Sequence, residues 1–246
     1  MTWQAARCRL DPEAVRAALG EACVAVVRGE PITDDAFVAF LEALGPLTFT
    51  AGETPLDGQP KLNVVTNVGR TRAPRSVFHT DTSYVAEPPA FTALKAEAIP
   101  EAGGETVFTN QFDAHDRLDP ALRERLHGAR VLHRVTGVDP GSGQEAETWH
   151  PLFRRHPVSG KTALFLSTPE RCVALQRADG AREDDLIPAL YDHSTDPAHE
   201  WRHRWAEGDI VIWDNRCTLH KADHSAVVGD RVLHRGMVAG EAPLAA

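Results

Sequence analysis

The sequence lacks the features that mark secreted, membrane-spanning or thiolate-zinc proteins. It has four cysteines in 246 residues, all far apart and without a C-x-x-C pair, which argues against a disulfide framework or a zinc site built on cysteine. No apolar run approaches the ~20 residues that cross a bilayer. The N-terminal residues also lack the apolar stretch of a signal peptide. We therefore expect a cytoplasmic protein with no membrane partner.

Basic residues are also scarce, and lysine is the rarest of them. The chain has 26 Lys and Arg against 35 Asp and Glu, which gives a formal net charge of −9 and argues against nucleic acids as partners. The hydrophobic fraction of 42% and the charged fraction of 25% are typical of globular proteins. Because the length suits a single core and no composition break marks a linker, we predict one domain spanning residues 1–246.

The pattern of apolar residues predicts a few early helices followed by many short strands. A helix is expected over 11–19, opened by Asp11 and Pro12 and ended by Gly20. Further helices are expected over 34–44 and 119–126, and a polar loop over 136–148. Strands are expected at 22–27, 62–66, 91–96, 130–135, 162–167, 209–213 and 231–238. This order predicts a mainly β fold with helical decoration (α+β), a β-sandwich or jelly roll.

Three residues among the histidines and acids could bind a metal. His79 and Asp81 are two apart, so in an extended segment their side chains point to the same side. His220 follows the apolar strand expected at 209–213. Two histidines and one carboxylate form the facial triad of non-haem Fe(II) oxygenases. Taken alone, the His79–Asp81 pair is more typical of a surface histidine beside a turn.

Two arginines near the C-terminus point to an anion site. Arg231 and Arg235 are four residues apart in an expected strand, so both face the side that carries Leu233 and Met237. Guanidinium groups on a half-apolar face suggest an enclosed site for an anion, because arginine is the natural fork for a carboxylate. The alternative is a solvated outer face.

Two blocks of the sequence, with a weaker link between them, resemble the taurine dioxygenase (TauD/TfdA) family of Fe(II)/2-oxoglutarate-dependent oxygenases. The resemblance covers about residues 45–240 and is densest in Phe78-His79-Thr80-Asp81-Thr82-Ser83-Tyr84 with Gly103-Gly104-Glu105-Thr106, and in 208–216, Leu219-His220 and 231–235. The combination is far more specific than any single motif.

This resemblance implies a double-stranded β-helix (jelly-roll) core and an enzyme that uses Fe(II), 2-oxoglutarate and O2. It implies that His79, Asp81 and His220 bind iron, and that Thr106 and Arg231 receive the 2-oxoglutarate carboxylate. Arg235 matches a position that meets the anionic group of the prime substrate. Related halogenases lack the carboxylate, so Asp81 favours hydroxylation or a similar oxidation of a C–H bond, with release of succinate and CO2. Relatives are commonly oligomeric, so a homo-oligomer is also expected.

The charges in the implied site indicate an acidic prime substrate. Iron, Asp81, 2-oxoglutarate and Arg231 nearly balance, which would leave Arg235 as a spare cation. Taurine itself is disfavoured, because the His and Tyr that meet the sulfonate in the taurine enzymes are absent after Leu44-Gly45-Pro46-Leu47. Two alternatives stay open: a cupin-like hydrolase or isomerase that uses the same triad with another metal, and a non-catalytic binder of small molecules.

Overall fold

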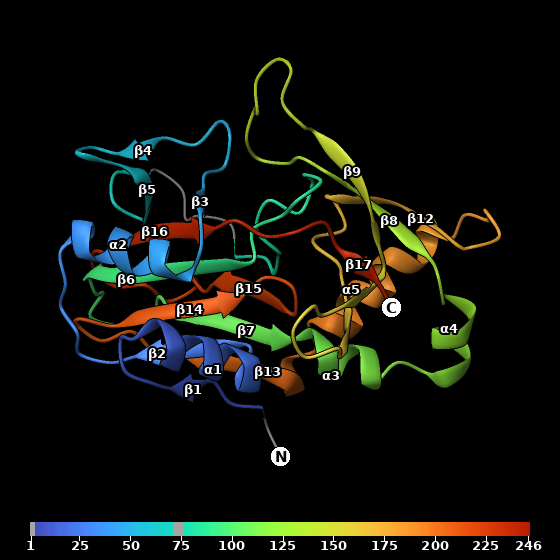
Figure 1. Ribbon diagram of the computed structural model, residues 1–246, viewed down its shortest axis with the longest axis horizontal. Coiled ribbons are helices and arrows are strands. Elements are labelled where there is room, and N and C mark those ends of the chain that lie inside the picture. Colours follow the sequence, from blue (N-terminus) through green and yellow to red (C-terminus); the bar gives the residue numbers. More distant parts are fainter. Residues whose placement is uncertain (1–2, 71–75) are drawn as a thin grey trace.

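The computed structural model describes residues 3–70 and 76–246 and is mainly β with a few short helices, as predicted (Figure 1). Its largest element is an eight-stranded sheet with all but one of its strand pairs antiparallel. In spatial order its strands are β1 (Ala6–Arg7), β2 (Val24–Val27), β14 (Ile210–Asp214), β6 (Phe91–Ala98), β16 (Val232–Val238), β5 (Gln59–Thr66) and β4 (Pro55–Leu56), with β3 (Leu47–Thr48) paired to β16.

Both faces of this sheet are buried, and strand β14 shows why. Its alternate residues point to opposite sides. Ile210 and Ile212 join one core with helices α1 (Pro12–Ala22) and α2 (Asp34–Leu44), and Val211 and Trp213 join a second core on the other face. A strand that is apolar on both sides is stable only where both sides are covered. The chain meets this requirement with two helices on one face and a second sheet on the other.

The second sheet has three antiparallel strands, β13 (Glu200–His203), β7 (Thr106–Asn110) and β15 (Thr218–Ala222), with β7 in the middle. Phe108 of β7 packs edge-on against Trp213 of the large sheet, with ring centroids 5.5 Å apart. The two sheets thus face each other across an aromatic core. The functional residues described below lie between these sheets.

A lateral region with its own apolar core, containing Leu126, Leu152, Leu164 and Leu190, lies beside the sandwich (Figure 1). Its strands form two small sheets: β12 (Cys172–Gln176), β8 (Arg130–Arg134) and β9 (Glu147–Pro151), and β11 (Thr162–Leu164), β10 (Phe153–Arg155) and β17 (Leu244–Ala245). Its helices are α3 (Gln111–Asp116), α4 (Pro120–Arg125) and α5 (Ile187–Ser194), with 3-10 turns at Asp184–Leu186 and Pro197–His199.

The predicted end of the first helix was wrong. Helix α1 passes through Gly20 and ends at Ala22, where Cys23 adopts a left-handed conformation and its N–H bonds to the carbonyl of Leu19. A glycine on an exposed helix surface costs about 1 kcal/mol relative to alanine, which is too little to end a helix whose apolar face is buried. The start was right, because the side chain of Asp11 accepts a hydrogen bond from the N–H of Ala14.

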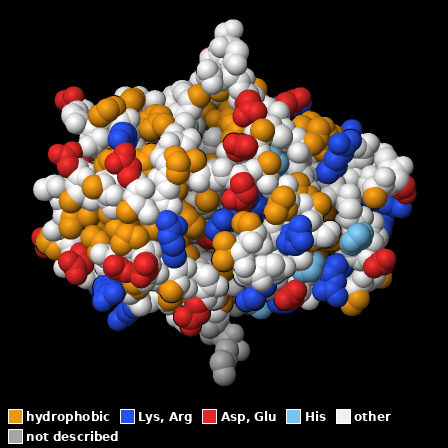
Figure 2. Space-filling view, in the orientation of Figure 1, with side chains coloured by type: hydrophobic (Ala, Val, Ile, Leu, Met, Phe, Trp, Pro, Cys, Tyr) orange, Lys and Arg blue, Asp and Glu red, His pale blue; other side chains and the backbone are white. Residues whose placement is uncertain are grey.

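The helix predicted over 34–44 has the bounds of α2, and the other predicted elements exist with shifted ends. The expected strand at 162–167 stops at Leu164, and the strand expected from Arg231 starts at Val232. Among the described residues, no helix is long and apolar enough to cross a membrane. On the face shown in Figure 2, acidic and basic side chains are interspersed, and no patch of one sign dominates.

Candidate metal centre and cosubstrate site

Backbone pairing brings the two predicted histidine ligands together. His220 lies in β15, and His79 lies in an irregular segment that forms an isolated antiparallel bridge with it. The N–H of His79 donates to the carbonyl of His220 at 2.9 Å, and the N–H of His220 donates to the carbonyl of His79 at 3.0 Å. This reciprocal pair fixes the two side chains next to each other, although 141 positions separate them in the sequence.

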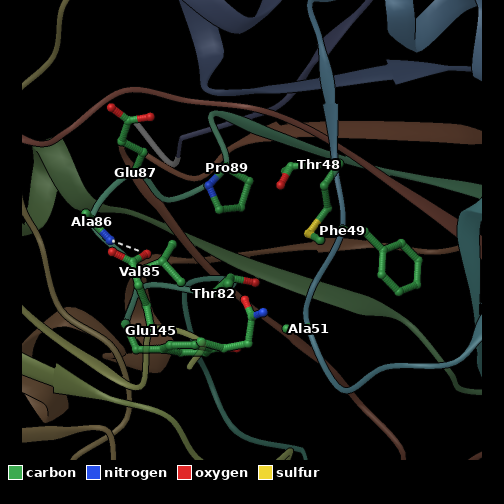
Figure 3. A pocket seen from close by; sticks show the side chains of 12 residues that line it. Thr48, Phe49, Ala51, Thr82, Val85, Ala86, Glu87, Pro89 and Glu145 are labelled. Atoms are coloured by element: carbon green, nitrogen blue, oxygen red, sulfur yellow. Dashed lines mark hydrogen bonds between the residues drawn. The ribbon is translucent and has the colours of Figure 1, made fainter. Parts of the chain in front are cut away.

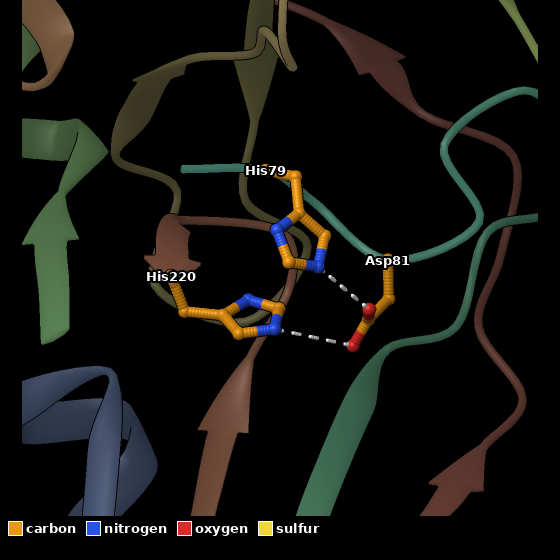
Figure 4. Close-up of side chains that lie close together, drawn as sticks. All are labelled: His79, Asp81 and His220. Carbon is orange, nitrogen blue, oxygen red and sulfur yellow. Dashed lines mark ion pairs between the residues drawn. The ribbon is translucent and has the colours of Figure 1, made fainter. Parts of the chain in front are cut away.

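Asp81 completes the predicted cluster (Figure 4). His79 Nε2 lies 3.5 Å from one oxygen of Asp81, and His220 Nε2 lies 3.8 Å from the other. One potential ligand atom from each residue lies within 4.8 Å of the others, so a single cation could bind all three. The structure therefore brings together all three predicted metal ligands.

The charge states of the cluster suit a metal. Burial alone would raise the pKa of Asp81, but His220, His79 and Arg235 around it hold that pKa well below its usual range. Burial lowers the pKa of His220 to about 3, so its imidazole is neutral at pH 7. His79 Nδ1 lies 3.0 Å from the carbonyl of Val77, a contact that leaves the Nε2 lone pair available. A carboxylate and two neutral imidazoles are the donors that Fe(II) prefers.

Buried polar residues that the sequence analysis did not identify hold the carboxylate in place. The hydroxyl of Thr92 in β6 donates to Asp81 Oδ2 at 2.7 Å. The side-chain amide of Asn215 donates to the same hydroxyl at 2.8 Å, and Trp213 donates to Asn215 at 3.0 Å. Asn215 is thus part of the scaffold that holds Asp81. The available signal was Thr92 itself, a polar residue at the start of an apolar strand.

Arg231 is fully buried and has no acidic partner among the residues that the structure describes. Its Nε donates to the carbonyl of Gly104 at 2.8 Å and its Nη2 to the hydroxyl of Thr106 at 3.2 Å, whereas Nη1 is buried without a partner. Burial lowers its pKa to about 10, so the group remains charged at pH 7. A buried, unpaired guanidinium is costly, and an anionic ligand would supply the missing counter-charge.

Thr106 lies beside this guanidinium with its proton free to donate. Its hydroxyl accepts hydrogen bonds from Arg231 and from Trp205 Nε1, at 3.0 Å. Thr106 starts β7 and pairs with Ala222, two residues beyond His220, so it lies about 7 Å along the sheet from the metal ligand. Gly104 has a φ of +74° and its carbonyl accepts from Arg231. The glycine turn and Thr106 therefore build one site.

Arg235 was predicted to be a spare cation, but in the structure it has an acidic partner, Glu53. It lines the same pocket as His79 and Asp81, with Nη1 3.8 Å from Asp81, but Nη2 pairs closely with Glu53. Its Nε donates to Asn63 at 3.0 Å. Arg235 is therefore not a spare cation, because Glu53 neutralises it. No local sequence pattern predicts this pair, whose members are 182 positions apart.

A second cluster with metal-like composition, His156, Asp214 and Cys217, is satisfied within the protein. Both oxygens of Asp214 accept from Arg216, at 2.8 and 2.6 Å, and Asp214 also pairs with His156. Burial raises the pKa of the Cys217 thiol well above its usual range, so it is not a thiolate. Asp214 is thus a scaffold residue.

Comparison with known proteins identifies the family. A family model described as taurine catabolism dioxygenase TauD, TfdA family, matches residues 3–237. The chain belongs to this family. The predicted class of enzyme, a 2-oxoglutarate-dependent non-haem iron dioxygenase, is confirmed.

Two characterised relatives and one solved structure show how far the similarity extends. The 2,4-dichlorophenoxyacetate dioxygenase of Cupriavidus pinatubonensis is 29% identical over 91% of this chain and 87% of its own. The sulfate ester dioxygenase of Pseudomonas putida is 30% identical over 94% of this chain and 82% of its own. The crystal structure of a taurine dioxygenase from Burkholderia xenovorans superposes with a TM-score of 0.80, at 30% identity, and covers 97% of this chain and 87% of its own.

Proposed function

We propose that this protein oxidises a C–H bond, most simply by hydroxylation, in a small acidic metabolite, with 2-oxoglutarate converted to succinate and CO2. The observation that supports this most directly is the buried Arg231 guanidinium, which has no acidic partner among the described residues. Its neutral partner Thr106 lies one step along the β7–β15 pair from the metal ligand His220. A metal site next to an unfilled anion site fits a chelating dicarboxylate.

The described residues fit both absent groups. His79, Asp81 and His220 would hold Fe(II), and the orphaned Nη1 of Arg231 together with the free proton of Thr106 would bind the far carboxylate of 2-oxoglutarate. When bound, iron, 2-oxoglutarate and O2 supply the oxidising power, which no side chain of the protein can supply. The protein binds and orients: Thr92 fixes Asp81, and Arg231 and Thr106 fix the cosubstrate.

Both named relatives act on anions according to their names, a phenoxyacetate and a sulfate ester, which supports an acidic prime substrate here. We also propose that residues 1–246 form one domain, that the two facing sheets are a double-stranded β-helix, and that the protein works in the cytoplasm. The free state of all four cysteines supports that location. A homo-oligomer and the absence of nucleic-acid binding stay predictions.

The test is the visible charge-transfer band that a chelate of Fe(II) and 2-oxoglutarate gives in the absence of O2. We expect this band in the wild-type protein and its loss in His220→Ala and in Arg231→Met at matched 2-oxoglutarate concentration. A wild-type protein that gives no band with saturating Fe(II) and 2-oxoglutarate would contradict the proposal. A hydrolase or isomerase that uses the same triad would instead turn over its substrate without 2-oxoglutarate.

A further inference from the structure

The pocket next to the metal cluster contains a second arginine, Arg171, whose charge is not neutralised by an ion pair among the described residues. The pocket has a volume of about 170 Å³, and His79 and Asp81 form part of its wall. Arg171 Nη1 donates to the carbonyl of Thr80 at 2.9 Å and Nη2 to the hydroxyl of Thr136 at 3.3 Å, both neutral partners. Its Nε is buried without a partner.

Tyr84 also lines this pocket, and its hydroxyl is unused. Its side chain is 2% exposed, and the hydroxyl has no hydrogen-bond partner among the described residues. The guanidinium carbon of Arg171 lies 5.5 Å from the centre of the Tyr84 ring. A buried tyrosine hydroxyl normally finds a partner, and leaving it without one is unfavourable. A donor and a cation left open side by side form a site for an oxyanion.

The charges of the pocket distinguish Arg171 from Arg235. All three nitrogens of Arg235 face partners within the protein, with Glu53 as its counter-ion. Among the residues that the structure describes, Asp81 is the carboxylate that acts on Arg171, and the metal would share its charge. With Glu53 cancelling Arg235 and 2-oxoglutarate balanced by iron and Arg231, Arg171 remains the uncompensated cation.

A larger cavity of about 380 Å³ adjoins this pocket, and Thr82 and Tyr84 line both (Figure 3). Its walls include Phe49, Val85 and Pro89, and Glu87 and Glu145 also line it. A ligand with its anionic group at Arg171 could extend its apolar part past Tyr84 into this cavity. The acidic side chains there would disfavour a second anionic group.

We propose that Arg171 and Tyr84 form the subsite that receives the single anionic group of the prime substrate, whose apolar body occupies the cavity beyond Tyr84. This inference rests on the proposed function, since it specifies the substrate of the same site. It assigns to Arg171 the role that the sequence had suggested for Arg235. Arg235 and Glu53 then shape the pocket as a neutral pair.

The experiment uses the Fe(II)–2-oxoglutarate complex of the full-length protein. Its probes are 2,4-dichlorophenoxyacetate and an alkyl sulfate, with 2,4-dichlorophenoxyethanol as the neutral match. We expect the acids, but not the alcohol, to shift the chelate band and to stimulate succinate release. Arg171→Gln should raise the acid concentration needed for half of this response roughly 10- to 100-fold, which corresponds to the loss of one charged hydrogen bond. Tyr84→Phe should raise that concentration about 3- to 10-fold.

The matched control removes the other ion pair without changing the net charge. The double variant Glu53→Gln/Arg235→Gln removes one charge of each sign from the pocket wall, and we expect it to keep the preference for the acids over the alcohol, because Arg171 remains. Tyr191→Phe is the control for loss of a tyrosine hydroxyl, since Tyr191 donates to the carbonyl of Phe78 and is not part of the pocket wall. This variant should leave the response unchanged.

The results separate the subsite from a structural role and from failure of the proposed function. Arg171 could instead serve only to anchor the backbone of Thr80. In that case Arg171→Gln would weaken the chelate band itself, and the remaining Fe(II)–2-oxoglutarate complex would respond to the acids as wild type does. That result would overturn the subsite. The proposal is also overturned if neither acid affects the complex at millimolar concentration, or if the alcohol acts as well as the acids. It is overturned as well if the double variant Glu53→Gln/Arg235→Gln loses the response to acids while Arg171→Gln keeps it. Absence of the band in wild type would instead contradict the proposed function.

Discussion

The hydroxyl of Thr92 donates to Asp81 Oδ2 at 2.7 Å, deep between the two sheets, where Thr92 is fully buried and Asp81 is 4% exposed. Asp81 lies in an irregular segment, whereas Thr92 lies in a central strand of the large sheet. The hydrogen bond therefore fixes the Asp81 carboxylate to the large sheet. The irregular backbone around Asp81 would hold this side chain less firmly by itself. Asn215 continues this chain by donating to Thr92.

Thr92→Val should weaken metal binding about 10- to 100-fold, the range found when partners of metal ligands are removed. Valine keeps the shape and the β-branch but removes the donor, so the fold should be retained. Thr92→Ser keeps the hydroxyl and should bind metal within a few-fold of wild type. Titration with Co(II) or Fe(II) in the absence of O2 measures the effect. Equal metal affinity in the valine and serine variants would show that the hydrogen bond does not position Asp81.

Arg231→Met should abolish the stabilisation by 2-oxoglutarate without destabilising the free protein. The buried guanidinium has no described counter-ion, so its removal relieves a desolvation cost, while methionine fills a similar volume. Thermal unfolding should show an unchanged or higher midpoint for the free variant. The KM for 2-oxoglutarate should rise roughly 100-fold, because one partner of a buried charge pair is lost. A lower midpoint combined with an unchanged KM would mean that the guanidinium only supports the fold.

Gly104→Ala should impair cosubstrate binding through contact with Arg231. A Cβ at this position would lie 3.0 Å from Arg231 Cδ and 2.9 Å from Pro100 Cγ, at a φ of +74°. The left-handed backbone alone costs alanine about 1–2 kcal/mol. Gly58→Ala is the matched control, since Gly58 has a φ of +76° and open space around it. Both variants should lose similar stability, but the KM for 2-oxoglutarate should rise only in Gly104→Ala. A rise in both, or in neither, would contradict this explanation.

A feature of the site could be predicted where a short stretch of sequence shows it, but not where it depends on contacts between distant residues. His79 and Asp81 lie two apart in a block that resembles the family, and the apolar strand predicted at 209–213 is visible from its composition. The candidate ligands and the mainly β class could therefore be predicted. The Glu53–Arg235 pair joins residues 182 positions apart and depends on how the sheet is assembled. No local pattern reports such a contact, and for this reason the charge count of the pocket was wrong.

Short elements were missed for a related reason. Strand β7 has five residues and helix α5 has eight, too few for a clear period of two or of 3.6. Their order comes from tertiary packing: Phe108 of β7 is fully buried against Trp213, and Leu190 of α5 is 2% exposed in the lateral core. Thr106 lies in the missed strand β7. The resemblance of its motif to the family predicted Thr106 as a site residue, although periodicity did not predict the strand.

His150 should make the metal-free protein less stable as the pH falls below 6.5. Burial lowers its pKa to about 4, and in the folded protein the ring is neutral with Nε2 2.9 Å from the carbonyl of Val85. The unfolded chain binds a proton near pH 6.5, so the contribution of His150 is complete above that pH and is lost as the pH falls toward 4, by about 3 kcal/mol in total. His150→Gln keeps a donor for Val85 but does not titrate. The free energy of unfolding in urea should therefore fall less steeply between pH 7 and pH 4 in this variant, by about 3 kcal/mol over the range. Parallel pH profiles for wild type and His150→Gln would show that His150 is protonated in the folded state as readily as in the unfolded state.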